Sequence, residues 1–182
     1  MSASKTARLV VVMGVSGCGK TTVGRLLAKR LKAEFLEGDD LHPPRNVERM
    51  TAGIALTDSD RRDWLLEIAQ QIADAHAAGH HLIVSCSALK RGYRNVLRAA
   101  SSSLAFVYLS APKPVLEARL AARTGHYMPV SLLESQLEIL EPPAADERAT
   151  TLDATLPAAE LAEQAAAWLT ALPPPAPSKA RK

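Results

Sequence analysis

The sequence predicts a fold of the α/β class, built around a parallel sheet. Residues 9–13, 82–84 and 104–109 form short apolar runs, as expected of strands buried on both faces of such a sheet. These runs alternate with longer segments whose apolar residues recur at helical spacing. A glycine-rich loop at residues 14–19 joins the first run to the first helical segment. Strand, glycine loop and helix in this order predict an anion site at the helix N-terminus.

Two long helices are expected in the first half of the chain. The first follows the glycine loop and has apolar residues at positions 23, 26, 27 and 31 on one face. The second spans about residues 58–78 and precedes Gly79, where a helix commonly stops. A short second strand is expected between them, at residues 34–36. Residues 1–6 are expected to be a frayed leader.

The second half of the chain continues the alternation. Helices are expected over residues 114–123, 130–140 and 157–172, and an edge strand within 150–156. From residue 173 to residue 182 the chain is rich in proline and basic residues, which predicts a disordered tail. Because no repeat or long linker divides the rest, residues 1–172 are expected to form a single domain.

Composition narrows the class of protein. The chain has 182 residues, of which 47% are hydrophobic and 23% charged, as in one soluble globular domain. Its formal charge is +3, and three basic residues among the last four account for that excess, so no nucleic-acid partner is expected. Cys18 and Cys86 cannot form a disulfide framework, and the sequence has no signal peptide or apolar run of membrane-spanning length. A cytoplasmic location without membrane attachment is expected.

Residues 14–21, GVSGCGKT, match the phosphate-binding pattern G-x-x-x-x-G-K-[ST] at every fixed position. The three glycines let backbone N–H groups point inward at a phosphate. Lys20 is expected to reach the β- and γ-phosphates, and the Thr21 hydroxyl to hold Mg²⁺. The pattern predicts a site for a nucleoside triphosphate with Mg²⁺. The expected nucleotide-binding residues are Gly14, Val15, Ser16, Gly17, Cys18, Gly19, Lys20, Thr21 and Thr22.

A second motif, EGDDLHP at residues 37–43, directly follows the strand expected at 34–36. In a parallel sheet, the carboxyl end of a strand beside the phosphate loop faces the ligand crevice. A carboxylate there can accept a proton from an attacking hydroxyl or hold waters of the Mg²⁺ shell, which makes Asp39 the candidate base. The alternative interpretation is that Asp39 and Asp40 only shape a turn.

A third motif, SCSALKRGYR at residues 85–94, follows the strand expected at 82–84. Motor-type NTPases usually end this strand with a metal-binding acid. Small residues stand here instead, which argues against that class. Lys90, Arg91 and Arg94 place positive charge near the crevice, where it would suit an anionic second substrate. A solvated helix face is the alternative.

A fourth motif contains Arg119 and Arg123, which lie four residues apart and share one face of the expected helix. The following Thr124 and Gly125 break the helix, so the segment of about residues 120–140 is expected to form a mobile lid. Lid arginines of small kinases neutralise the charge that develops on the transferred group, which makes Arg123 a catalytic candidate. Ordinary surface arginines are the alternative.

Together the motifs resemble the gluconokinase family, within the wider group of shikimate and nucleoside-monophosphate kinases. The resemblance runs in order over about residues 8–150 and includes GVSGCGKTT, EGDDLHPPRNVERM, CSALKRGYR and RLAARTGHYM. It implies a three-layer phosphate-loop kinase fold with a parallel sheet of about five strands, phosphate transfer from ATP to D-gluconate, and a homodimer. It further implies that Asp39 contacts a substrate hydroxyl, that Arg119 lies against the adenine and that Arg123 meets the phosphates.

The acceptor pocket implied by this resemblance must satisfy several hydroxyls and one carboxylate. Asp39 and His42 are the candidates for the hydroxyls. The candidate cations for the carboxylate are Arg45, Arg49, Lys90 and Arg94, and His126 is a further substrate-binding candidate. Glu37 departs from the pattern of the wider group, which often has aspartate here, and is expected to hold a metal-bound water.

Two alternatives stay open. A related kinase could act on shikimate or a nucleoside monophosphate, although the His42-Pro43 pair and the third motif are not features of those relatives. The other alternative is a nucleotide-dependent regulator that has no acceptor substrate. A guanine-specific switch would need an Asn-Lys-x-Asp motif, and that tetrapeptide does not occur in the sequence.

Overall fold

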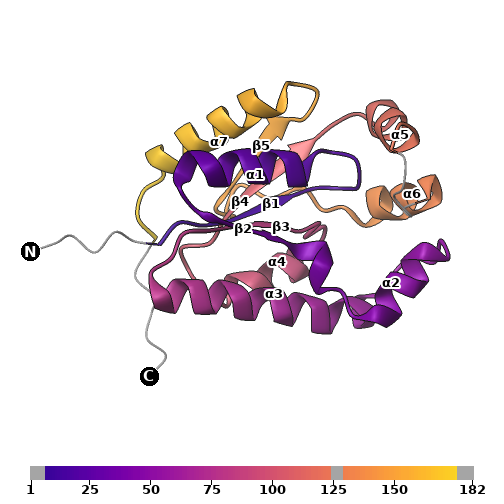
Figure 1. Cartoon of the computed structure of the whole chain (residues 1–182), viewed down its shortest axis with the longest axis horizontal. Helices are drawn as coiled ribbons and strands as arrows, with labels where there is room; N and C mark the ends of the chain where they lie inside the picture. The colour runs from indigo at the N-terminus through magenta and orange to yellow at the C-terminus, as the bar shows by residue number, and fades with distance from the viewer. Residues whose placement is uncertain (1–6, 124–128, 176–182) are drawn as a thin grey trace, which may run out of the picture.

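A computed structural model describes residues 7–123 and 129–175 of the chain. At its centre lies a sheet of five parallel strands in the order β2-β3-β1-β4-β5 (Figure 1). The strands are β1 (Leu9–Met13), β2 (Glu34–Glu37), β3 (Leu82–Ser85), β4 (Ala105–Ser110) and β5 (Ala149–Asp153). Val11 of the central strand β1 is in register with Val84 on one side and Phe106 on the other. The predicted α/β class and parallel sheet are confirmed.

Helices cover both faces of this sheet (Figure 1). On one face α1 (Lys20–Leu31) packs against α7 (Ala158–Ala171), and on the other α3 (Asp58–Ala78) packs against α4 (Arg91–Arg98). Beyond the carboxyl ends of the strands lie the 3₁₀ helix η1 (Gly38–Leu41) and the helices α2 (Pro44–Thr51), α5 (Lys113–Ala121) and α6 (Val130–Ile139). In the part of the chain that the structure describes, none of the helices is long and apolar enough to cross a bilayer.

The hydrophobic core lies on both sides of β1. All five residues of this strand are buried, and those from Val11 to Met13 have no exposed surface. Because helices cover both faces, neither set of alternating side chains can be polar without a partner. From α1, Val23 and Leu27 join this core, whereas Leu26, expected on the same face, is 37% exposed. The buried face of α1 is therefore narrower than its sequence pattern indicates.

α3 begins and ends at the residues that its sequence predicts. At its N-terminus the Thr57 hydroxyl accepts from the Asp60 N–H at 3.1 Å, and the Asp60 carboxylate accepts from the Thr57 N–H at 2.8 Å. Gly79 ends the helix with a φ of 71°, in the left-handed region that glycine adopts without strain. This capping box holds the first turn of α3, next to the site described below, in a defined position.

The short helix α2 was not expected from the sequence, and a helix at α4 was considered only as the alternative interpretation of the third motif. α2 begins at Pro44, directly after Pro43, and buries only Asn46, so it has no apolar stripe. α4 buries Arg94 together with Tyr93 and Leu97, and the charged residue interrupts the apolar pattern. The other expected elements are present with slightly shifted ends. Helices of this length rely on tertiary contacts rather than on a pattern of their own.

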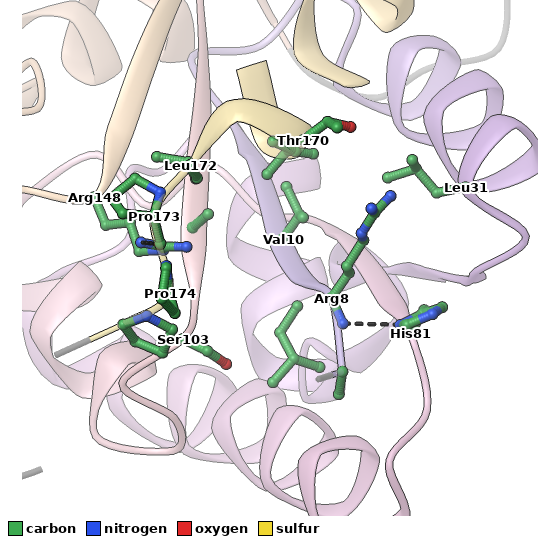
Figure 2. A pocket seen from close by; sticks show the side chains of 15 residues that line it. Arg8, Val10, Leu31, His81, Ser103, Arg148, Thr170, Leu172, Pro173 and Pro174 are labelled. Carbon is green, nitrogen blue, oxygen red and sulfur yellow. Dashed lines mark hydrogen bonds between the residues drawn. The ribbon is translucent and has the colours of Figure 1, made fainter. Parts of the chain in front are cut away.

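The amino end of the sheet, opposite the glycine loop, holds the beginning of the tail that was expected to be disordered. Residues 173–175 form part of the wall of a cavity of about 440 Å³ (Figure 2). Arg148 also lines this cavity and donates to the carbonyl oxygen of Pro173 at 2.8 Å. The rest of the predicted tail, residues 176–182, lies outside the described residues.

Candidate active site

The glycine loop between β1 and α1 has a backbone that suits anion binding. Gly14 and Gly19 have φ angles of 143° and 97°, which favour glycine. At Gly14 a side chain is excluded for a second reason, because a Cβ would lie 2.8 Å from the carbonyl oxygen of Leu109. The side chains of Val15 and Cys18 are buried, so they anchor the loop to the core. The backbone of the loop is left to meet a ligand.

This loop opens into a cavity of about 500 Å³. Lys20, Glu37, Asp39 and Arg123 come from three segments of the chain, and all line it. The Lys20 ammonium donates to the Val15 carbonyl oxygen at 3.1 Å. The other lining residues are Ser16, Gly17, Gly19, Thr21, Thr22, Arg25, Asp40, Val47 and Met50. Most of the expected nucleotide-binding residues therefore surround one cavity at the N-terminus of α1.

A smaller pocket of about 30 Å³ adjoins this cavity. The two spaces share Ser16, Lys20, Asp39 and Met50. The remaining wall of the small pocket is formed by His42, Leu56, Arg61, Trp64, Ser87 and Gln136. Asp39 and Lys20 thus stand where the phosphate-loop cavity meets a second space, which is lined by both polar and apolar residues.

Glu37, the last residue of β2, is held beside the start of α1. The Thr21 hydroxyl donates to its Oε2 at 2.5 Å, and the Ser85 hydroxyl donates to its Oε1. Ser85 ends β3, the strand that lacks the acid expected of motor-type NTPases. The carboxylate at this edge is therefore supplied by the neighbouring strand, and Ser85 orients it. A hydroxyl and a carboxylate side by side are oxygen ligands that suit Mg²⁺ and its waters.

His42 forms one wall of the small pocket. Its side chain is only 4% exposed, and its ring stacks on Trp64 with centroids 4.0 Å apart and planes inclined by 15°. Burial, together with the positive charge of Arg61, lowers the pKa of His42 to about 4. The imidazole is therefore neutral at physiological pH. It can form hydrogen bonds, but it cannot balance the charge of an anionic substrate.

The hydrogen bonds of Asn46 decide which nitrogen of His42 carries the proton. Asn46 Nδ2 donates to the Asp60 carbonyl oxygen at 2.8 Å and lies 3.2 Å from His42 Nδ1. Because a carbonyl oxygen only accepts, Asn46 must present its NH₂ group on this side, and Nδ1 accepts from it. The proton of His42 then lies on Nε2, which is 4.0 Å from Oδ1 of Asp39. An N–H donor beside a carboxylate suits a sugar hydroxyl.

Three of the four cations expected to meet the substrate carboxylate are paired with acids away from both spaces. Arg45 pairs with Asp63 at 2.7 Å. Lys90 donates to both carboxylate oxygens of Asp58, at 3.0 and 3.1 Å. Arg49 lies 3.4 Å from a carboxylate oxygen of Asp60. None of these three basic residues lines either space.

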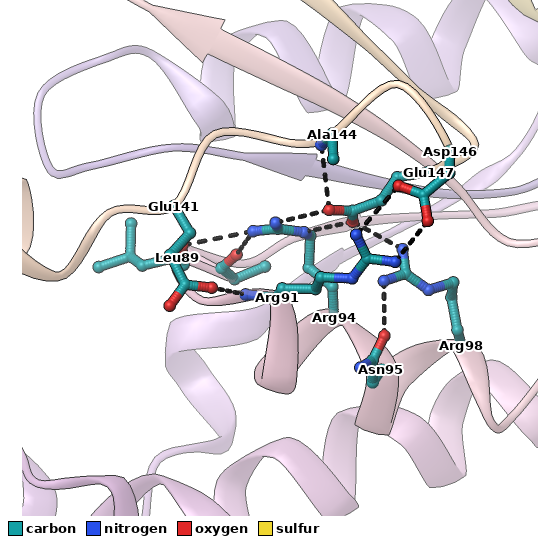
Figure 3. A network of polar contacts seen from close by, with 10 residues as sticks. Leu89, Arg91, Arg94, Asn95, Arg98, Glu141, Ala144, Asp146 and Glu147 are labelled. Carbon is teal, nitrogen blue, oxygen red and sulfur yellow. Dashed lines mark hydrogen bonds and ion pairs between the residues drawn. The ribbon is translucent and has the colours of Figure 1, made fainter.

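The expectation that Arg94 binds the substrate is wrong. Its side chain has no exposed surface, and its guanidinium forms two hydrogen bonds to the Glu147 carboxylate, at 2.7 and 2.9 Å (Figure 3). It also donates to the carbonyl oxygens of Ala88 and Leu89, at 2.9 and 3.3 Å. Arg98 adds a further bond to Glu147 at 2.8 Å. Arg94 thus ties α4 to the segment before β5, a contact between residues far apart in the sequence.

The pKa of Glu147 shows how strongly this network stabilises the ionised carboxylate. Burial by itself would raise its pKa, but the hydrogen bonds from Arg94 and Arg98 outweigh burial and lower the pKa from about 4.5 to about 2. A carboxyl whose pKa is lowered on folding stabilises the protein above its unfolded pKa. The stabilisation is therefore present above about pH 4.5 and is lost as the pH falls through about 2.

Replacing Arg94 by methionine should destabilise the fold without changing substrate affinity. In the variant, Glu147 stays buried and keeps only part of the hydrogen bonding that compensates its charge. Removing one partner of a buried ion pair costs about 3–5 kcal/mol of stability. We expect a large fall in the free energy of unfolding, measured with urea. Arg91→Met is the matched control, since Arg91 pairs with Asp146 on the surface and should change stability little. A raised KM for the acceptor in the folded Arg94→Met protein would restore the binding role.

The lid expected over about residues 120–140 takes in the end of α5 and the whole of α6. Arg119, on α5, donates to the Ala154 carbonyl oxygen at 2.7 Å, and Arg123 lines the larger cavity. His126, predicted to bind substrate, lies outside the described residues. Gln136, on α6, accepts a hydrogen bond from the Ser16 N–H of the glycine loop at 2.7 Å. α6 therefore contacts the phosphate loop directly.

Sequence reasoning missed Arg61, Trp64, Ser87 and Gln136 as lining residues. For Arg61 and Trp64 a signal exists in the sequence. Arg61 is three residues before Trp64, so it shares the face of α3 that is otherwise apolar. The helical spacing alone therefore indicates that Arg61 is buried, and a buried charge needs a partner. Nothing in the sequence pattern marks Ser87 or Gln136.

A family model described as an AAA domain matches residues 9–143. A gluconokinase of Gluconobacter oxydans is 51% identical to this chain over 140 residues, which are 77% of this chain and 79% of that relative. This chain belongs to the gluconokinase family. The thermosensitive gluconokinase of Escherichia coli is a further relative, 43% identical over 138 residues, which are 76% of this chain and 74% of that protein.

Solved structures agree with membership of the gluconokinase family. A gluconokinase from Sinorhizobium meliloti superposes with a TM-score of 0.82 at 46% identity, covering 91% of this chain and 93% of that one. A sugar kinase from Janibacter sp. superposes with a TM-score of 0.87, also at 46% identity, covering 90% and 95%. A shikimate kinase from Aquifex aeolicus, with a TM-score of 0.55 at 16% identity, covering 88% and 95%, shares the fold alone. The predicted family and the phosphate-loop kinase fold are confirmed.

Proposed function

We propose that this chain transfers the γ-phosphoryl group of ATP to a hydroxyl of D-gluconate, giving ADP and 6-phospho-D-gluconate. The observation that carries the proposal is the position of Asp39. This carboxylate lines both the phosphate-loop cavity and the small pocket, with Lys20 also shared between them. An acceptor hydroxyl beside Asp39 would therefore stand next to the γ-phosphate of a nucleotide on the glycine loop. Membership of the gluconokinase family supports gluconate as the acceptor.

Each residue at this junction has a defined task in the proposed reaction. Asp39 orients the attacking hydroxyl and accepts its proton. Lys20 and Arg123 balance the negative charge on the phosphoryl oxygens during transfer. His42 donates its Nε2–H to a second hydroxyl, which fixes the sugar chain relative to Asp39. In the proposed complex, Arg119 lies against the adenine of ATP.

Mg²⁺ is part of the proposal, and the residues present fit it. The Thr21 hydroxyl and the Glu37 carboxylate are 2.5 Å apart at the mouth of the glycine loop. Mg²⁺ prefers such oxygen ligands and keeps several of its waters. Thr21 would bind the ion directly and Glu37 would bind one of its waters. An ion held there would supply positive charge to offset that of the phosphates.

The choice of acceptor tests the proposed function. We expect kcat/KM for D-gluconate to exceed that for glucose, shikimate, AMP and CMP by at least about 10²-fold, because buried polar groups reject a substrate that leaves them unpaired. ADP release measured with each acceptor gives the comparison. Glucose is the sharpest control, since it is similar in size but lacks the carboxylate. Equal rates on glucose and gluconate would exclude recognition of the acid, and strong activity on shikimate or AMP alone would identify a different kinase.

A homodimer and a cytoplasmic location complete the proposal. The homodimer rests on the resemblance to the family, and light scattering of the purified protein at micromolar concentration would test it. The location is supported by Cys18 and Cys86, which are both free and buried in the interior. Unpaired thiols of this kind suit a reducing compartment.

A further inference from the structure

Arg61 lies in the first turn of α3 and forms part of the wall of the small pocket. Only 7% of its surface is exposed. The pocket that it lines also contains Asp39 and His42, the two residues proposed to hold substrate hydroxyls. Its charge reaches this space, since Arg61 contributes to the lowered pKa of His42. Arg61 is therefore a buried cation at the proposed acceptor site.

The guanidinium of Arg61 lacks a full set of hydrogen-bond partners. Its Nη1 is buried and has no acceptor among residues 7–123 and 129–175. Two acids near Arg61 accept hydrogen bonds from other residues: Asp58 accepts from Tyr93 and Lys90, and Asp60 accepts from Thr57. The contact of Arg61 with the Tyr93 ring, at 5.6 Å from the centroid, supplies no hydrogen-bond acceptor.

A buried arginine that forms no salt bridge with the described acids is costly in the free protein. Arginine cannot lose its proton at accessible pH, so the charge stays and must be compensated. An anionic ligand group would supply that compensation, and a carboxylate matches the planar fork of N–H donors. The pocket beside Arg61 has a volume of about 30 Å³, and roughly 10–15 Å³ suffices for one water-sized group. It therefore has room for the two oxygens of a carboxylate but not for a whole sugar acid.

We propose that Arg61 binds the carboxylate of the acceptor and is the residue that selects an acid over a neutral polyol. This inference rests on the proposed function and names the cation that the proposed substrate requires. With the carboxylate in the small pocket, the hydroxylated chain of D-gluconate extends past Asp39 and Lys20 into the larger cavity. The hydroxyl at the far end of the chain, rather than one next to the acid, then meets the phosphate donor. Arg61 takes the place of the cations expected from sequence.

The test compares Arg61→Gln with Arg62→Gln on D-gluconate and on D-glucitol, the polyol without the carboxylate. Arg62 is the adjacent, exposed residue of α3 and serves as the matched control. Loss of a charge-assisted contact should raise KM for D-gluconate about 10- to 100-fold in Arg61→Gln, with a smaller change in kcat. Activity on D-glucitol should change little, so the preference for the acid collapses. Arg62→Gln should behave as the wild type on both acceptors.

A second measurement does not depend on turnover. D-gluconate should raise the Tm of the wild type and of Arg62→Gln, but not that of Arg61→Gln. ATP should raise the Tm of all three, which shows that each protein is folded. If Arg61→Gln does not fold, Arg61→Lys keeps the charge without the fork and should show an intermediate KM.

The outcomes separate this inference from the proposed function. A wild type that phosphorylates D-gluconate, with an Arg61→Gln variant of unchanged KM and unchanged preference over D-glucitol, overturns the role of Arg61 and leaves the function intact. A wild type without activity on D-gluconate overturns the proposed function, and the carboxylate role with it.

Discussion

Replacing Lys20 by alanine should lower kcat by about 10²-fold or more. The ammonium of Lys20 stands at the N-terminus of α1, 3.1 Å from the Val15 carbonyl oxygen, and lines both spaces of the site. It is therefore placed to balance charge on the transferred group, where one preorganised contact is worth on the order of 3 kcal/mol. Steady-state ADP release with saturating D-gluconate and ATP measures the effect.

Lys29→Ala provides the matched control for this experiment. Lys29 lies in the last turn of the same helix and is exposed, so its removal alters the charge of α1 without touching the site. We expect normal turnover from that variant. A near-normal kcat in Lys20→Ala would mean that the glycine loop does not hold the phosphates of the reacting nucleotide.

Asp39→Asn should lower kcat by roughly 10²–10⁴-fold while the affinity for ATP changes little. Asparagine keeps the size of the side chain but cannot accept the proton of the attacking hydroxyl. Because Asp39 lines the acceptor pocket as well as the larger cavity, its loss should affect the chemical step more than nucleotide binding. Stopped-flow single turnover gives the chemical step, and titration with ATP gives the affinity.

Asp40→Asn separates the two adjacent aspartates. Asp40 lines the larger cavity but not the small pocket, so its loss should leave the acceptor KM close to that of the wild type. If Asp39→Asn loses ATP binding instead of turnover, Asp39 belongs to the metal shell. The base would then be Asp40 or Glu37.

The sequence by itself determined the local parts of this protein. The phosphate-loop pattern identifies the glycine loop because its glycines and lysine are adjacent in the chain. The bounds of α3 follow from Thr57 and Asp60 at one end and Gly79 at the other, which act within a few residues. The buried strand β1 is visible as an apolar run. Each of these signals depends on neighbours in sequence, and such signals need no knowledge of the fold.

Tertiary structure decided which charged residues face the site. Arg94 and Arg61 are both buried. Arg94 pairs with Glu147, which lies 53 residues further along the chain, whereas Arg61 has a buried nitrogen that has no acceptor within the part of the chain that the structure describes. Only the packing of α3 and α4 against the sheet distinguishes a structural ion pair from a cation available to a ligand.

The same holds for the contact between α6 and the glycine loop. Gln136 and Ser16 are 120 residues apart, and no pattern in either segment predicts that their hydrogen bond forms. Local sequence determines whether a segment is helix, strand or loop, because the backbone responds to its nearest side chains. The identity of a side chain's partner depends on how distant segments pack, so the sequence indicated Lys20, Asp39 and His42 as site residues, but only the tertiary structure brought them together with Ser87 and Gln136 in the small pocket.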